Sequence, residues 1–151
     1  MSYSITELCN GCGACVRLCP VGAIRGERKA LHVLDGERCI ECGACGRICP
    51  REALLDAERN ICRRIPKLSL WPRPVIDLKK CMSCRICVEG CPAHCLAATI
   101  DPGDKHLRAA LTEPKKCISC GFCEEGCPAE AIVLAVPAPP LEMHEQGEER
   151  P

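Results

Sequence analysis

Aromatic residues are almost absent from this chain, which has one Trp, one Tyr and one Phe among 151 residues. Large aromatic side chains normally contribute much of the area that a core buries. A small unit without them has little interior in which hydrophobic burial alone could stabilise a fold. We therefore expect a second source of cohesion inside this molecule.

Several functional signatures are missing as well. The longest apolar run, at 131–136, is strand-sized and far shorter than the roughly 20 residues that span a membrane. Residues 1–8 lack the basic-then-apolar pattern of a signal segment, so we expect a location in the reducing cytoplasm. No activated nucleophile, paired carboxylates, phosphate loop or dinucleotide fingerprint is recognisable, and we expect no catalysis of substrate chemistry by this chain alone.

Charge of one sign does not dominate either, since 20 Lys and Arg balance 20 Asp and Glu. Residues 1–70 carry 11 basic and 8 acidic side chains, whereas residues 71–151 carry 9 and 12. A nucleic-acid partner would require a clustered basic face, and we expect none. The acidic excess lies in the segment 137–151, whose composition predicts an extended or disordered tail that could order on a partner.

Cysteine, by contrast, is abundant, with 18 residues of which sixteen follow the pattern C-x2-C-x2-C-x3-C-P. The pattern occurs four times, at Cys9, Cys12, Cys15 and Cys19; Cys39, Cys42, Cys45 and Cys49; Cys81, Cys84, Cys87 and Cys91; and Cys117, Cys120, Cys123 and Cys127. This is the ligand run of [4Fe-4S] clusters, in which the fourth cysteine binds the cluster of a partner run. Four runs therefore predict two pairs and four [4Fe-4S] clusters.

The spacing between runs predicts how they pair. The intervals from Cys19 to Cys39 and from Cys91 to Cys117 are short, whereas a longer, proline-containing stretch separates Cys49 from Cys81. We therefore pair the first run with the second and the third with the fourth, and leave the nested pairing of the first run with the fourth as the alternative. The expected ligand sets are Cys9, Cys12, Cys15 and Cys49; Cys39, Cys42, Cys45 and Cys19; Cys81, Cys84, Cys87 and Cys127; and Cys117, Cys120, Cys123 and Cys91.

The repeat predicts an α+β fold of two tandem ferredoxin-like domains with short strands and single-turn helices. The expected divisions are a first domain at 1–61, a Pro-rich linker at 62–74, a second domain at 75–136 and the tail at 137–151. In the first domain we expect strands at 2–5, 23–24, 31–34 and 53–55 and helical turns at 13–18 and 43–48. In the second we expect strands at 75–78, 97–100, 107–111 and 131–136. Because cluster binding becomes folding free energy in such small units, we expect the iron-free chain to be largely unfolded.

The two halves are not identical. Cys9 and Cys39 are 30 residues apart, whereas Cys81 and Cys117 are 36 apart. The six added residues predict a longer hairpin, either a tolerated surface insertion or a docking element. The one tryptophan, Trp71, lies in the linker, where we expect it to anchor against a surface of this chain or of a partner.

Residues between and after the ligands are expected to shape and tune the clusters. Each fourth cysteine is followed by a proline, which turns the chain away, and glycines in the loops permit close approach of the backbone: Pro20, Pro50, Pro92 and Pro128; Gly11, Gly13, Gly43 and Gly121. Arg85 stands where the other runs have glycine, so it either raises the reduction potential of the third cluster or points to solvent. We expect Cys62 and Cys95 to be free thiols and assign no chemistry to the four histidines.

The four cysteine-proline runs, which extend over both halves to about Val136, resemble the bacterial two-cluster ferredoxin family duplicated in tandem. The size and arrangement are also similar to the small polyferredoxin subunits of multi-subunit oxidoreductases in anaerobic bacteria, including those with tungsten-pterin aldehyde oxidoreductase and flavoprotein partners. That resemblance implies an electron-transfer subunit that connects a catalytic subunit to a flavin subunit or to other copies of itself. A free soluble polyferredoxin is the alternative, and a zinc-binding interaction module is a third.

Overall fold

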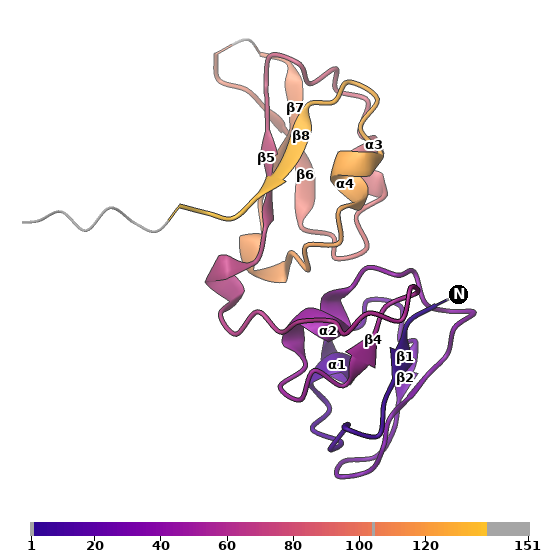
Figure 1. Cartoon of the computed structure of the whole chain (residues 1–151). Coiled ribbons are helices and arrows are strands. Elements are labelled where there is room, and N and C mark those ends of the chain that lie inside the picture. The colour runs from indigo at the N-terminus through magenta and orange to yellow at the C-terminus, as the bar shows by residue number, and fades with distance from the viewer. Residues whose placement is uncertain (1, 104, 139–151) are drawn as a thin grey trace, which may run out of the picture.

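The computed structural model describes residues 2–103 and 105–138, which form two similar halves joined by residues 62–72 (Figure 1). The first half contains β1 (Ser4–Ile5), α1 (Ala14–Leu18), β2 (Ile24–Arg25), β3 (Val33–Leu34), α2 (Ala44–Ile48) and β4 (Leu54–Leu55). The second half contains β5 (Arg73–Ile76), α3 (Ile86–Glu89), β6 (Leu96–Ile100), β7 (Leu107–Leu111), α4 (Phe122–Glu125) and β8 (Ile132–Ala135). Two 3₁₀ turns, η1 (Leu68–Leu70) and η2 (Pro114–Lys116), complete the described elements. The predicted α+β fold is confirmed.

Antiparallel pairing closes each half on itself. The first and last strands of the first half pair, with Ser4 opposite Leu55, and those of the second half pair in the same way, with Ile76 opposite Ile132. The inner strands form the hairpins β2–β3 and β6–β7. Each half thus begins and ends at the same sheet, which places its two cysteine runs between the paired terminal strands and the hairpin.

The expected strands occur, with differences at their ends. β5 begins at Arg73, inside the segment predicted to be linker, and pairs Arg73 with Ala135 and Pro74 with Leu134. Proline is tolerated here because β5 belongs to a two-stranded sheet and has a free edge. In the second half the predicted longer hairpin is present, with five residues in each of β6 and β7 against two in each of β2 and β3.

Cysteine and small aliphatic residues fill the interior of both halves. The buried clusters comprise Cys15, Ile24, Cys45, Cys49, Ala53 and Leu54 in the first half, and Cys87, Cys91, Cys95, Leu96, Ala109, Cys117 and Ile132 in the second. Thiols therefore occupy the positions at which an ordinary small domain would bury large side chains. The dependence on another source of cohesion, expected from the lack of aromatics, is visible in this packing.

The linker is packed against the first half. Trp71 is 0% exposed, and its indole Nε1 donates to the carbonyl oxygen of Ile65 at 3.0 Å. The guanidinium carbon of Arg47, on α2, lies 5.8 Å from the centre of the indole ring. The surface that holds Trp71 therefore belongs to this chain.

The chain ends and the helix lengths bear on two further expectations. The predicted tail at 137–151 lies almost wholly beyond the described residues, which end at 138. Among the described helices, none has both the length and the apolar character that a membrane crossing requires.

Candidate metal centres

The four cysteine loops share one backbone conformation. In every run the residue before the second cysteine and the residue after it have positive φ, at Gly11 and Gly13, Glu41 and Gly43, Ser83 and Arg85, and Ser119 and Gly121. This left-handed backbone costs non-glycine residues free energy, so its recurrence at Glu41, Ser83, Arg85 and Ser119 shows that the loop shape imposes it. At Gly11 a Cβ would also lie 2.4 Å from the backbone nitrogen of Ala30, so glycine is required there.

A second shared turn follows the fourth cysteine and its proline. The residue three positions after this cysteine has positive φ and donates its N–H to the cysteine carbonyl in each run: Gly22, Glu52, His94 and Glu130. In three runs the next residue is alanine, whose N–H donates to the cysteine sulfur: Ala23 to Cys19 at 3.3 Å, Ala53 to Cys49 at 3.4 Å and Ala131 to Cys127 at 3.3 Å. These donors stabilise negative charge on the sulfur.

The loops enclose four cavities of similar volume, about 320, 340, 410 and 320 Å³ in the order of the predicted ligand sets. Their lining cysteines are Cys9, Cys12, Cys15 and Cys49; Cys19, Cys39, Cys42 and Cys45; Cys81, Cys84, Cys87 and Cys127; and Cys91, Cys95, Cys117, Cys120 and Cys123. The structure thus brings together the thiols of each predicted set, three from one run and one from its partner run.

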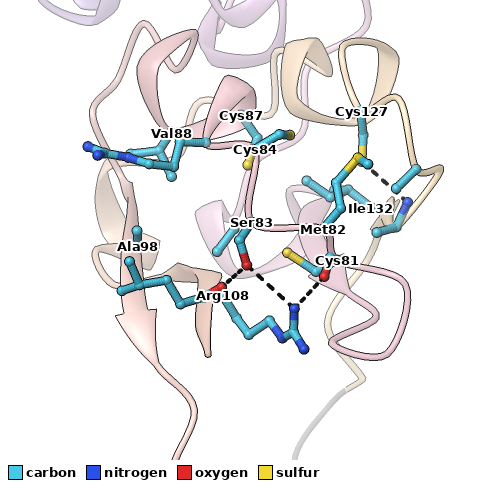
Figure 2. A pocket seen from close by; sticks show the side chains of 15 residues that line it. Cys81, Met82, Ser83, Cys84, Cys87, Val88, Ala98, Arg108, Cys127 and Ile132 are labelled. Atoms are coloured by element: carbon cyan, nitrogen blue, oxygen red, sulfur yellow. Dashed lines mark hydrogen bonds between the residues drawn. The ribbon is translucent and has the colours of Figure 1, made fainter. Parts of the chain in front are cut away.

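The cavity of the third run illustrates the arrangement (Figure 2). Cys81 and Cys84 approach from the loop that leads into α3, Cys87 lies on α3 itself, and Cys127 approaches from the opposite run. Arg108 on β7 holds this loop, because its Nη1 donates to the carbonyl oxygen of Cys81 at 2.6 Å, and the Ser83 hydroxyl donates to the carbonyl of Leu107. The longer hairpin of the second half therefore supports a cysteine loop directly.

The thiols line the walls of their cavities. Among the described residues, no three His, Cys, Asp or Glu side chains are arranged to hold a single metal ion. In a [4Fe-4S] cluster each thiolate binds its own iron, so the four sulfurs surround the cluster at its corners. A cavity lined by four or five thiols therefore suits a cluster of this type.

Electrostatics inside the cavities also fits bound iron. Burial, followed by the charges of Cys49, Cys9 and Cys12, raises the pKa of Cys15 to about 11. Burial and the neighbouring Cys42 and Cys39 raise the pKa of Cys45 to about 12. Like charges at such short range disfavour simultaneous ionisation, and positive iron is the usual means of holding several thiolates together.

The same effect operates in the second half. Burial, then Cys84, Cys81 and Cys127, raises the pKa of Cys87. At Cys123, burial together with Cys120 and Cys117 raises the pKa to about 12. The groups that perturb each thiol thus belong largely to its own predicted set.

The two additional cysteines occupy different environments. Cys62 packs against α2, where a Cβ on Gly46 would lie 2.3 Å from the Cβ of Cys62. Cys95 is 2% exposed and lines the cavity of the fourth run, with its sulfur 3.5 Å from that of Cys91. Although burial opposes the shift, hydrogen bonds from Cys95 lower the pKa of Cys91.

Two residues near the cavities had no role in the sequence analysis. His32 is 3% exposed, and its Nδ1 lies 3.1 Å from the carbonyl oxygen of Ala30 and 3.7 Å from the sulfur of Cys9. Because a carbonyl oxygen can only accept, Nδ1 is the donor in its contact with Ala30. Arg47 contacts two cysteine loops. The sequence signal for a role of this position was the arginine at the same place in the first run, Arg17.

Arg85 adopts the left-handed conformation that the three matching glycines adopt, with φ of 63°. Its side chain is 57% exposed, and its Nε lies 3.9 Å from Oε1 of Glu89. Arg85 also lines the cavity of the third run. The guanidinium therefore lies beside the cavity, as the tuning of the third cluster would require, and is also largely in solvent. Glu89 partly neutralises its charge.

Two matches to known protein families cover most of the described chain. Residues 8–54 match one family model described as a 4Fe-4S dicluster domain, and residues 73–128 match a second with the same description. No curated protein matches the chain.

Similarity to solved structures is weaker. A chain of the formate dehydrogenase–heterodisulfide reductase–formylmethanofuran dehydrogenase complex from Methanospirillum hungatei is 20% identical, with a TM-score of 0.43. The alignment covers 91% of the present chain and 54% of that chain, so the present chain spans about half of its length. Similarity at this level does not establish a shared function.

Proposed function

We propose that this chain, which belongs to the 4Fe-4S dicluster domain families, transfers electrons as the iron-sulfur subunit of a multi-subunit oxidoreductase. It carries two dicluster domains and therefore four [4Fe-4S] clusters. The observation that carries the proposal is the set of four similar cavities, each lined by four or five thiols. Bound in them, a [4Fe-4S] cluster accepts and donates one electron at a time.

The proposed ligands are the four predicted sets. Cys9, Cys12, Cys15 and Cys49 hold the first cluster; Cys39, Cys42, Cys45 and Cys19 hold the second; Cys81, Cys84, Cys87 and Cys127 hold the third; and Cys117, Cys120, Cys123 and Cys91 hold the fourth. Each set contains at least one buried thiol, and only Cys12 and Cys84 of the proposed ligands are exposed. The N–H groups of Ala23, Ala53 and Ala131 stabilise the charge on three of the ligand sulfurs.

Exposure differs among the proposed ligands and supports exchange with partners. Cys12 of the first run and Cys84 of the third run are exposed, whereas Cys15, Cys45 and Cys87 are buried. Exposed apolar side chains line the same cavity as Cys84, with Met82 62% exposed and Leu107 47% exposed, next to the exposed guanidinium of Arg85. An exposed ligand beside exposed apolar side chains is suited to a docked protein through which an electron enters or leaves.

The proposed partners are a catalytic oxidoreductase subunit and a flavoprotein subunit, as in a complex of the tungsten aldehyde oxidoreductase type, and self-association is a related arrangement. In this proposal the chain itself is not catalytic, because its chemistry-bearing residues are committed to the four centres. We infer a cytoplasmic location, because a reducing compartment keeps cysteines from forming disulfides and so leaves them available to bind iron. The alternative function is that of a freely diffusing polyferredoxin.

Anaerobic purification of a tagged full chain from its native host tests the proposal. We expect about sixteen iron and sixteen sulfide per chain, as four cubane clusters require. Stoichiometric co-elution of an enzyme that contains a pterin or a flavin would establish the subunit role, and an isolated chain with full iron content would establish the free carrier. A chain purified anaerobically with zinc and without iron would refute electron transfer altogether.

A further inference from the structure

Arg47 lies where the two halves meet. It belongs to the last turn of α2, and Figure 1 shows α2 on the side of the first half that faces the second. Both terminal nitrogens of its guanidinium donate to the carbonyl oxygen of Cys42 at 3.1 Å. Its Nη2 also donates to the carbonyl oxygen of Ser119, 72 residues further along the chain. One side chain thus connects a cysteine loop of each half.

The linker secures this connection. The indole of Trp71 lies beneath the guanidinium, in cation–π geometry, and the N–H of Ile65 donates to the carbonyl oxygen of Arg47 at 3.0 Å. On the other side, the hydroxyl of buried Ser119 donates to the carbonyl oxygen of Pro72 at 2.5 Å. Arg47 is therefore held by the linker on one side and contacts both loops on the other.

The connection brings two centres together. Ser119 lies between Cys117 and Cys120, so Arg47 contacts the loops of the second and fourth runs. The centres of the second and fourth runs are thus the two whose loops meet at the boundary between the halves.

The repeated sequence shows that this residue is not a requirement of the cysteine loop. The position two residues after the third cysteine is Arg17 in the first run, Arg47 in the second, Glu89 in the third and Glu125 in the fourth. Arg17 is exposed, whereas Arg47 is partly buried. Four loops of the same conformation therefore accept either charge here, and the boundary between the halves distinguishes Arg47.

We propose that Arg47 is a positioning residue that holds the loop of Cys42 against the loop of Ser119 and favours the reduced state of the centres on both sides. The inference rests on the proposed electron-transfer function. A positive charge in a partly buried position stabilises added negative charge more strongly than an exposed one, because water screens it less. Exchange across the boundary oxidises one centre and reduces the other by one electron, with no bond made or broken.

Redox titration of the full chain tests this role. Wild type, Arg47→Gln, Arg47→Lys and the matched control Arg17→Gln are purified anaerobically and assayed for iron and sulfide. Stepwise reduction with dithionite, followed by electron paramagnetic resonance, gives the four midpoint potentials and the magnetic interaction between reduced centres. A wild-type chain without reversible reduction would overturn the proposed function and this inference with it.

With wild type reducible, the variants decide the role of Arg47. In Arg47→Gln at full iron content, we expect two midpoints to become more negative and the interaction between the halves to weaken. Arg17→Gln should move one midpoint at most, and Arg47→Lys should restore the midpoints because it keeps the charge. Four unchanged midpoints in Arg47→Gln, or equal effects of Arg17→Gln and Arg47→Gln, would overturn the proposal. If Arg47→Gln loses iron, Arg47→Lys provides the test instead. Midpoints shifted from wild type in an Arg47→Lys chain with full iron content would also overturn the proposal.

Discussion

The two halves build the same cavities from the same cysteine pattern, yet they support them differently. In the first half the hairpin strands have two residues each, and Cys62 returns from beyond β4 to pack on α2. In the second half the strands of the hairpin have five residues each, and Arg108 from that hairpin holds the third cysteine loop. The comparison indicates that the cysteine loops set the architecture, whereas the segments around them adjust stability and potential.

Removal of iron should have the largest effect on the two halves, because both should unfold. Both cores consist of thiols and small aliphatic residues, so neither half retains enough apolar burial without its centres. We expect chelation under anaerobic conditions to abolish the dispersed amide resonances of both halves. An iron-free second half that stayed folded would show that its longer hairpin supplies the missing stability, and would contradict the prediction.

Gly46→Ala should destabilise the first half alone. The new Cβ would lie 2.3 Å from the Cβ of Cys62, and overpacking of this kind costs about 1–3 kcal/mol. Denaturant-induced bleaching of the visible absorbance, followed anaerobically, should begin at a lower denaturant concentration and involve half of the iron. Adding Cys62→Gly should relieve the clash, and equal destabilisation with and without that change would contradict this explanation.

Cys95→Ala should change one reduction potential without loss of iron. The other three runs have alanine at this position, namely Ala23, Ala53 and Ala131, so the variant makes the third run resemble them. With Cys91 bound to iron, the Cys95 thiol is the donor across the 3.5 Å contact, and its loss should lower one midpoint by less than about 60 mV, the equivalent of a tenfold change in a one-electron equilibrium.

Redox titration of Cys95→Ala beside the wild type checks this shift, with Cys62→Ala as the control that removes a thiol remote from the cavity of the fourth run. Four unchanged midpoints would mean that Cys95 is a packing residue. Loss of four iron would instead show that Cys95 is required to keep a centre.

Arg85→Gly should have the smallest effect on potential. The guanidinium is 57% exposed and shares its charge with Glu89, so solvent and the carboxylate reduce its influence on the third centre. We expect one midpoint to become slightly more negative and the chain to resist unfolding better, since glycine relieves the positive φ. Glu89→Gln provides the opposite change, and identical midpoints in both variants and wild type would eliminate the tuning role of Arg85.

The order of the elements could be predicted because the cysteine spacing and the glycine and proline positions are local signals. The longer hairpin of the second half and the anchoring of Trp71 could be predicted as well. The start of β5 at Arg73 could not, because a proline at position 74 usually argues against a strand and the partner of Arg73 in the sheet is the distant Ala135. The position of His32 could not be predicted either, because it approaches Cys9 only after the chain has folded back at the hairpin.

By itself the sequence determined that this protein has two similar halves and that sixteen of its cysteines act in four runs, since three-residue spacing fixes which thiols a short loop can present together. The tertiary structure decided which side chains sit between the halves. Arg17 and Arg47 occupy the same place in the repeat, yet only Arg47 meets a linker indole and the carbonyl of Ser119. That distinction depends on contacts between residues distant in sequence, which no local pattern specifies.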